Sequence, residues 1–171
     1  MLRDELLRRA ERDQRVREAA TARGGQLTIV QGLRFLWTDL RNAGWLARTV
    51  RRHGWPGVAA VGTEGAHAAW LLAQHADWRP RLQRRFLEAM REAVEAGDAD
   101  RADLAYLEDR VRVNAGRPQL YGTQYHTTET GFGPRPIEDP DRVDERRAEV
   151  GLPPMAENDA RMRRLASGEG P

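Results

Sequence analysis

Two histidines and two acidic residues lie in or beside an otherwise apolar stretch, Thr63 to Asp77. At about 100° per residue, Glu64, His67 and His75 fall within roughly 80° of one another on a helix. A buried imidazole or carboxylate must be hydrogen-bonded, paired or bound to a metal, or its pKa shifts until the charge disappears. We therefore expect this helix to form one wall of a functional site.

His75 and Asp77 are the first candidates for acid–base chemistry. A histidine oriented by a carboxylate is a common general base, which predicts His75 as the base and Asp77 as the residue that orients it. Two residues at i and i+2 diverge by about 160° within a regular helix, so this contact requires the helix to end near them. The alternative is that His75 donates to a core carbonyl while Asp77 only caps the next helix.

A polar, glycine-rich segment at residues 116–136 supplies a second group of candidates. Tyr121 could act as an acid or as a donor to an oxyanion, and Gln119 and Gln124 could contact an uncharged part of a substrate. The alternative is that both glutamines satisfy the backbone of their own loop. A loop of this length is often functional, so we expect it to complete the site.

Three further residues are candidates for substrate binding. Arg110 could clamp a carboxylate or a phosphate, although a buried salt bridge with Asp109 or Asp77 explains it equally well. His67 is either a direct contact or an interior histidine paired with Glu64. Trp55 is either part of the pocket wall or part of the core.

A metal site is a weaker interpretation. The spacing Glu64-x-x-His67 is that of di-iron carboxylate bundles, which need a second such pair. His53 and His126 lack a glutamate three residues earlier, so the second pair is missing. A single divalent metal held by His67, His75 and Asp77 remains as an alternative. We expect neither a metal nor an organic cofactor.

Residue types that are absent exclude several classes of enzyme. The chain has no cysteine, all 28 basic residues are arginine, and the only serine is Ser167 near the end. Thiolate nucleophiles, Schiff-base lysines, phosphate-binding loops with a lysine, and serine nucleophiles are therefore excluded. Any catalysis must use His, Asp, Glu, Tyr, Thr or Arg side chains.

Charge and hydropathy indicate a protein of the cytoplasm. The net charge is only +2, and between residues 4 and 15 arginines alternate with acids, which predicts a solvated helix face with i, i+4 ion pairs. This pattern disfavours a nucleic-acid interface, which would show a basic stripe with interleaved aromatic residues. Neither a signal peptide nor an apolar run of about 20 residues is present, so we expect a cytoplasmic location and no membrane partner.

The elements that would position these residues form an all-α fold. We expect a single compact antiparallel helical domain over residues 1–166, with about six to seven helices and the long functional loop. Residues 1–23 form an N-terminal helical arm that offers a surface for a homo-oligomer, and residues 167–171 form a disordered tail. Residues 24–37 fit either a short strand or a helix. The expected helices span residues 2–22, 39–52, 63–76, 80–97, 100–116, 141–150 and 154–166.

Four short motifs occur in a fixed order along the chain: HGWP at 53–56, QHAD at 74–77, DR at 109–110 and QxYGTQ at 119–124. With them the chain resembles, over about residues 38–155, a bacterial family known as domain-of-unknown-function family 6624. The resemblance implies a helical fold and a shared pocket. It carries no biochemical activity over to this chain.

Together these observations predict a small enzyme that needs no cofactor and acts on a small molecule by acid–base chemistry. The site would lie between the helix 63–77 and the loop 117–126, with catalytic residues His75, Asp77 and Tyr121. The reaction class stays open among lyase, cyclase, isomerase and hydrolase. The alternative is a non-catalytic ligand-binding or protein-interaction module in which the same polar residues are structural.

Overall fold

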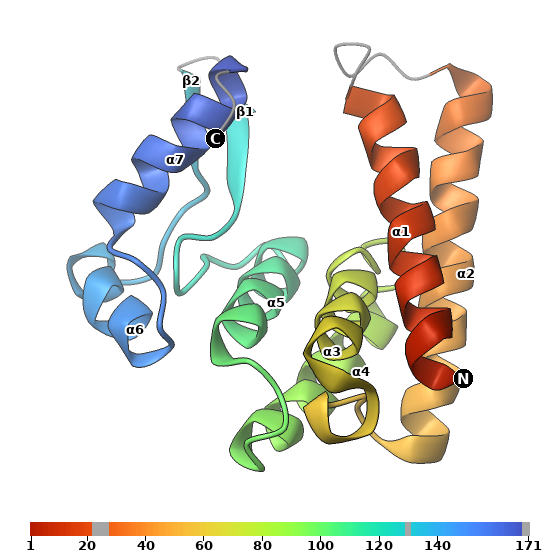
Figure 1. The fold of residues 1–171 in the computed structure, drawn as a ribbon. Helices are drawn as coiled ribbons and strands as arrows, with labels where there is room; N and C mark the ends of the chain where they lie inside the picture. The colour runs from red at the N-terminus through yellow and green to blue at the C-terminus, as the bar shows by residue number, and fades with distance from the viewer. Residues whose placement is uncertain (22–27, 129–130, 169–171) are drawn as a thin grey trace. The chain divides into compact units, whose positions relative to one another are not determined.

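The computed structural model describes residues 1–21, 28–128 and 131–168, and these residues are mostly helical with one small two-stranded sheet (Figure 1). Their contacts divide the chain into two compact units, Met1–Asp100 and Arg101–Pro171. The predicted helical architecture is therefore confirmed in its coarse form, whereas the sheet was missed. A single antiparallel helical domain is not confirmed.

The first unit consists of four helices and the second of three, together with a hairpin and a short 3-10 helix, among the described residues. The elements of the first unit are α1 (Leu2–Thr21), α2 (Ile29–His53), α3 (Val58–Gln74) and α4 (Pro80–Glu95). Those of the second are α5 (Arg101–Asn114), β1 (Tyr125–Thr128), β2 (Gly131–Pro134), η1 (Pro140–Arg142), α6 (Val143–Glu149) and α7 (Met155–Ser167).

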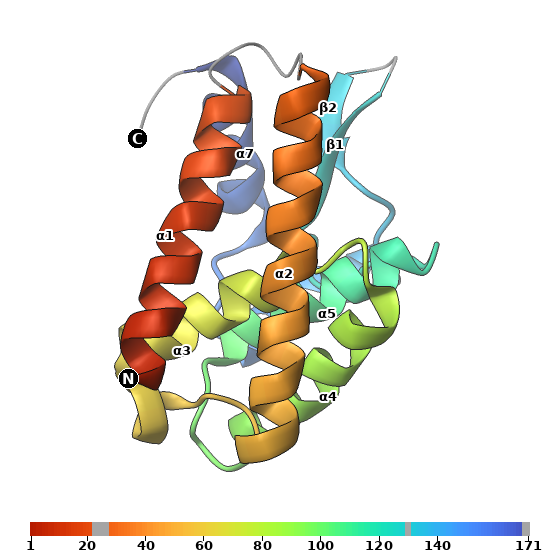
Figure 2. The same cartoon turned by 90° about the vertical axis from the view of Figure 1, so that its right-hand side faces the viewer.

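Helix α1, the predicted N-terminal helical arm, contributes to the core of the first unit. It lies beside α2 in both views and packs most extensively on α3 (Figures 1 and 2). Leu6 is fully buried, as are Leu46 of α2, Leu72 of α3 and Phe86 of α4. The apolar stripe of this predicted N-terminal helix is therefore covered by the neighbouring helices.

Helix α2 includes the segment for which the sequence left strand and helix open. Thr28 forms a capping box: its hydroxyl accepts from the Gln31 backbone N–H, and the Gln31 side chain accepts from the Thr28 N–H. This cap satisfies two backbone donors at the first turn, so the helix begins at Ile29 despite the β-branched pair there. Residues 24–27 lie outside the described part of the chain. The helix ends at His53, and its C-cap is Gly54, whose φ of 75° favours glycine.

Helix α3 is kinked at Gly62, which has a φ of 72° and a ψ of 168°. The chain is helical on both sides of the kink, so a regular helical segment begins at Thr63, where the sequence predicted a start. The preceding turn from Val58 was not predicted. At the other end His75 occupies the C-cap, where its backbone N–H donates to Leu71.

The loop predicted at 116–136 contains the antiparallel hairpin β1–β2. Tyr125 lies opposite Pro134, and the rings of Tyr125 and Phe132 stack with their centroids 5.4 Å apart. The strands have four residues each, which is too short for a clear alternating pattern in the sequence. At the chain end α7 runs to Ser167, the first residue of the predicted tail. Residues 169–171 lie outside the described part.

Across residues 1–21, 28–128 and 131–168, every helix is too short or too polar to cross a membrane.

Candidate functional site

His75 contacts a buried carboxylate that comes from the first helix. Its Nδ1 lies 2.5 Å from Oδ2 of Asp13 on α1, and Asp13 is only 1% exposed. The His75 side chain keeps 15% of its surface exposed. His75 is the C-cap of α3, and Asp13 of α1 is a partner that the sequence did not predict for it.

The contact belongs to a larger group of charged side chains on α1, α2 and the α3–α4 connection, which we call the acid cluster. Arg17 Nε lies 3.0 Å from Asp13 Oδ2, and Arg17 Nη2 donates to Asp39 Oδ1 over 2.8 Å. Asp77 joins it electrostatically, because its charge acts on Asp39. The acid cluster comprises Asp13, Arg17, Asp39, His75 and Asp77.

The three carboxylates of the acid cluster differ in their environments. Burial alone would raise the pKa of Asp13, but the hydrogen bonds and charges of His75 and Arg17 outweigh it and lower the pKa. Burial raises the pKa of Asp39 to about 7, against the opposing charge of Arg17 and with added repulsion from Asp13 and Asp77. Asp13 is therefore ionised at neutral pH, whereas Asp39 is close to half-protonated.

This arrangement suits proton transfer. An ionised Asp13 can only accept a hydrogen bond, so the proton between the two groups belongs to Nδ1 of His75 when the imidazole is neutral. A carboxylate at this nitrogen fixes the tautomer and stabilises the imidazolium that forms when the ring takes up a proton. The neighbouring Asp39 can hold or release a proton near neutral pH.

Asp13 and Asp39 were missed at the sequence level, although each leaves a signal there. Leu6, Ala10, Asp13 and Arg17 recur at spacings of four, three and four residues, which places Asp13 on the buried stripe of α1. We interpreted residues 4–15 as a solvated face, which holds for the exposed pair Glu11–Arg15 but is wrong for Asp13.

Asp39 lies on a similar stripe of α2, with Phe35, Asn42 and Leu46 at the same spacings. Asp39 is 5% exposed and Leu46 is fully buried. An acid on the apolar stripe of a helix was the signal that could have identified both residues.

Asp77 makes a contact with α4 that the sequence did not predict. Asp77 Oδ1 accepts from Gln83 Nε2 on α4 over 3.1 Å, and this glutamine also donates to the carbonyl of Gln74. Asp77 thus ties the end of α3 to α4 through Gln83. It is not the cap considered as the alternative, because the N-cap of α4 is Arg79 and no side chain among the described residues caps this helix. Its charge still bears on the acid cluster through Asp39.

His67 and Glu64 do not share an interior face. Both are exposed: Glu64 pairs with Arg3 of α1 over 2.5 Å, and the His67 ring lies 4.7 Å from that of Trp70. No group of three His, Cys, Asp or Glu side chains among the described residues could hold a metal ion. The alternative metal site of His67, His75 and Asp77 has no geometric support.

In the second unit, Asp109 holds the loop that carries the other candidates. Its carboxylate accepts from the backbone N–H groups of Leu120, Tyr121 and Thr123 over 2.6–3.2 Å, and from the Thr123 hydroxyl over 2.9 Å. Burial raises the pKa of Asp109, and these hydrogen bonds oppose the rise. The DR motif therefore supplies an anchor for the QxYGTQ motif.

Gln119 and Gln124 are used inside the same loop. The Gln119 side chain donates to the carbonyls of Gln124 and Arg135 and accepts from the Gln124 N–H. The Gln124 side chain donates to the Thr123 hydroxyl and accepts from Arg110 Nη1 over 3.0 Å. Gln119 is fully buried, so its predicted contact with a substrate gives way to a structural role.

Tyr121 and Trp55 have different surroundings. Burial, followed by the charges of Glu108 and Asp109, raises the pKa of the half-buried Tyr121, which keeps its hydroxyl protonated. Its backbone carbonyl accepts from Arg147, a fully buried arginine. Trp55, in the first unit, is buried in the core, and its Nε1 has no hydrogen-bond partner within the described residues.

Comparison with known proteins gives one family. The family of unknown function DUF6624 matches residues 1–168, and the chain belongs to it. Searches of curated proteins and of solved structures returned no match.

Proposed function

We propose that this member of the DUF6624 family is a cytoplasmic enzyme that acts on a small molecule by acid–base chemistry, without an organic cofactor. The observation that carries this function is the 2.5 Å contact between His75 Nδ1 and the buried Asp13 carboxylate. A carboxylate at one ring nitrogen decides which nitrogen carries the proton and leaves the other nitrogen able to accept one. A histidine held by an ionised carboxylate is poised to accept a proton.

The roles follow from the geometry of the first unit alone. His75 is the general base, and Asp13 is the positioning residue that fixes its tautomer. Asp39, with a pKa of about 7, is the group that can take up or return the proton during turnover. Asp77, which the sequence predicts to orient His75, also adds negative charge that acts on Asp39. The reaction stays within the group of lyases, cyclases, isomerases and hydrolases.

The test is a substrate screen followed by variants at His75 and Asp13. For any compound turned over by the protein, His75→Ala should lower kcat/KM by about 100- to 10,000-fold, the usual contribution of a general base. Added imidazole should restore part of the activity of His75→Ala. Asp13→Asn should lower kcat with a smaller effect on KM.

The matched control is His53→Ala, because His53 is exposed at the end of α2. It should leave kcat/KM within about twofold of the parent. Full turnover by a folded His75→Ala variant would exclude His75 as the base.

The hydrogen bonds around Asp109 favour a second candidate, a non-catalytic binding or interaction module. Gln119, Gln124 and Arg110 are bonded to the loop or to one another, as expected if these residues only brace the fold. In that case His75→Ala and Asp13→Asn would lower the free energy of unfolding, and the screen would give no turnover dependent on either residue.

A further inference from the structure

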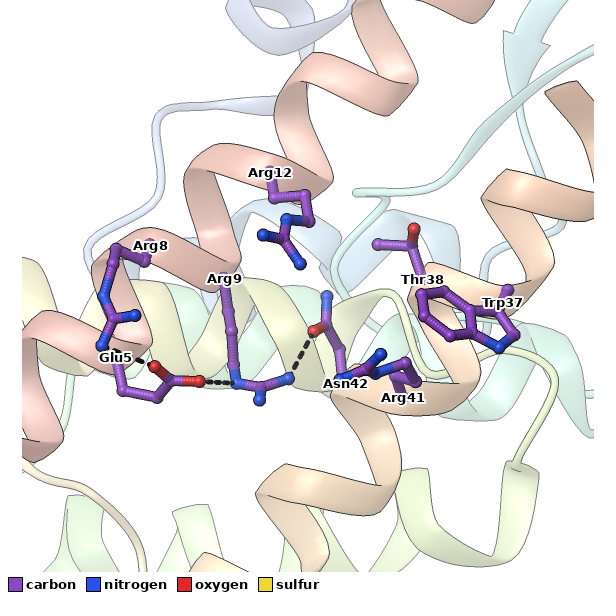
Figure 3. A pocket seen from close by; sticks show the side chains of 8 residues that line it. All are labelled: Glu5, Arg8, Arg9, Arg12, Trp37, Thr38, Arg41 and Asn42. Carbon is purple, nitrogen blue, oxygen red and sulfur yellow. Dashed lines mark hydrogen bonds and ion pairs between the residues drawn. The ribbon is translucent and has the colours of Figure 1, made fainter.

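An arginine-lined pocket lies between α1 and α2, separate from the residues of the acid cluster (Figure 3). Figure 3 shows side chains from both helices directed toward the space between them. The lining residues are Glu5, Arg8, Arg9, Arg12, Trp37, Thr38, Arg41 and Asn42.

The lining carries a surplus of positive charge. Four arginines face one acid, and Glu5 pairs with Arg8 and Arg9 over 2.7 Å each. Of the residues that the structure describes, none places a carboxylate against Arg12 or Arg41. Arg41 instead lies 4.3 Å from the centre of the Trp37 ring. Guanidinium groups that converge without an acid create a site for an anion.

The pKa of Arg9 is affected both by burial and by repulsion from neighbouring arginines. Burial, together with the charges of Arg41 and Arg12, lowers the pKa of Arg9, and the contact with Glu5 only partly offsets the effect. A bound anion would relieve this repulsion.

Asn42 gives an independent indication of a ligand. It is 6% exposed, and its Oδ1 accepts from Arg9 Nη1 over 3.2 Å. Its Nδ2 is buried and has no hydrogen-bond partner among the described residues. In Figure 3 this nitrogen points into the space below Arg12 and beside Thr38. A buried amide donor without a partner is rare in a folded protein, and here it lines a pocket that attracts anions.

We propose that this pocket binds the phosphate group of a phosphomonoester ligand, with Arg12, Arg41 and the Asn42 amide as its main donors. A phosphomonoester carries close to two negative charges at pH 7 and three terminal oxygens, which match several guanidinium groups and an N–H donor. The pocket volume of about 80 Å³ is several times the roughly 10–15 Å³ that one water needs on the same measure, so a phosphate-sized group fits. The exposed ring of Trp37 lies at the edge, where the rest of the ligand would extend.

Isothermal titration calorimetry with phenyl phosphate tests the pocket on the intact protein. We expect saturable binding with one site, and binding of phenyl sulfate, a monoanion of similar shape, at least about tenfold weaker. Arg12→Gln and Arg41→Gln should each weaken the binding about 10- to 100-fold, the range for a lost charged hydrogen bond.

The matched control is Arg15→Gln. Arg15 is also on α1, but it is exposed, pairs with Glu11 and is not part of the lining. It should change the affinity by less than about twofold. Equal losses for Arg15→Gln and Arg12→Gln would show attraction by net charge alone and overturn the site.

Asn42→Asp is a second variant, and it keeps a side chain of nearly the same size at this position. The carboxylate keeps an acceptor for Arg9 but opposes the anion, so binding of phenyl phosphate should be lost while the thermal midpoint does not fall. Retained binding by Asn42→Asp, or no saturable binding by the parent protein, overturns the site.

A second arm with phosphatidylcholine vesicles, with and without phosphatidic acid, distinguishes a lipid headgroup from a soluble ligand. Binding to the vesicles that depends on both phosphatidic acid and Arg12 assigns the phosphate to a lipid. Because none of these measurements involves turnover, they can fail while the acid–base function of His75 stands, and the reverse also holds.

Discussion

At the scale of single residues, the acid cluster holds more negative than positive charge in a buried place. Asp13 contacts both Arg17 and His75, Asp39 contacts Arg17, and Asp77 adds a third negative charge. Asp13 and Asp39 are almost fully buried. Because like charges close together cannot all stay ionised at low cost, one aspartate must keep a high pKa. Asp39 has this raised pKa, whereas the pKa of Asp13 is lowered.

Asp39 should make the protein less stable as pH rises. Between the usual pKa of 3.8 and the folded value of about 7, the unfolded chain has lost a proton that the folded protein keeps. Raising the pH through this window therefore favours unfolding, and the effect is complete above pH 7. Asp39→Asn removes it, so the stability of the variant relative to the parent should rise by about 2 to 3 kcal/mol from pH 5 to pH 8.

Urea unfolding of both proteins at these two pH values measures the difference. A relative stability of Asp39→Asn that stays constant or falls between pH 5 and pH 8 would contradict a raised pKa.

Asp13 should be the most costly of the three aspartates to remove. Asp13→Ala removes the buried carboxylate that contacts both His75 and Arg17, and breaking a buried ion pair costs about 3 to 5 kcal/mol. Asp4→Ala, an exposed aspartate on the same helix, should cost less than about 0.5 kcal/mol. Chemical denaturation near pH 7 compares the two variants, and equal losses would show that the Asp13 contacts contribute little.

At the scale of elements, glycine sets the course of α3. Gly62 combines a φ of 72° with a ψ of 168°, a region that is essentially restricted to glycine. Gly62→Ala should therefore lower the free energy of unfolding by about 1 to 3 kcal/mol, although a Cβ there would meet only the distant Arg3 side chain.

Gly32→Ala is the matched control, because Gly32 lies inside α2 with open space around its Cβ position. It should raise the stability by about 0.5 to 1 kcal/mol. Thermal unfolding of both variants distinguishes backbone strain from crowding. If Gly62→Ala leaves the free energy of unfolding unchanged, the positive φ at this position does not contribute to stability.

The loop anchored by Asp109 should lose its order when this carboxylate is removed. Three backbone N–H groups and one hydroxyl converge on it, so Asp109→Ala leaves several buried donors without an acceptor. We expect the amides of Leu120, Tyr121 and Thr123 to exchange with solvent at least about tenfold faster in the variant. Hydrogen exchange followed by NMR measures each amide, with Leu107 of α5 as a reference. Unchanged protection of the three loop amides would contradict the anchoring role.

Elements with a strong local pattern were predicted from the sequence. The helical stripes and the stops at Gly54 and Gly97 gave most of the helices, since these signals lie within a few residues of the element they define. The hairpin was missed because strands of four residues carry too little periodicity. His75 was identified, but its contact with Asp13 joins residues 62 positions apart, which local spacing cannot reveal.

At the scale of the whole molecule, the two units have cores of different character. The first buries mostly apolar side chains from four helices, including Leu6, Leu46, Leu72 and Phe86. The second buries several polar groups, among them Asp109, Gln119 and Arg147, which hold loops through backbone hydrogen bonds. Apolar burial stabilises a fold without geometric demands, whereas buried polar networks depend on every partner being in place.

The first unit should consequently fold as a separate fragment. Residues 1–100 contain the acid cluster, the arginine pocket and the whole four-helix core. A chain of about 100 residues is long enough to form a stable core of its own. The fragment 1–100 should show a helical circular dichroism spectrum and cooperative unfolding in urea, and Leu72→Ala should lower its stability by about 2 to 5 kcal/mol. A fragment without a cooperative transition would show that residues 101–171 are needed to complete the core.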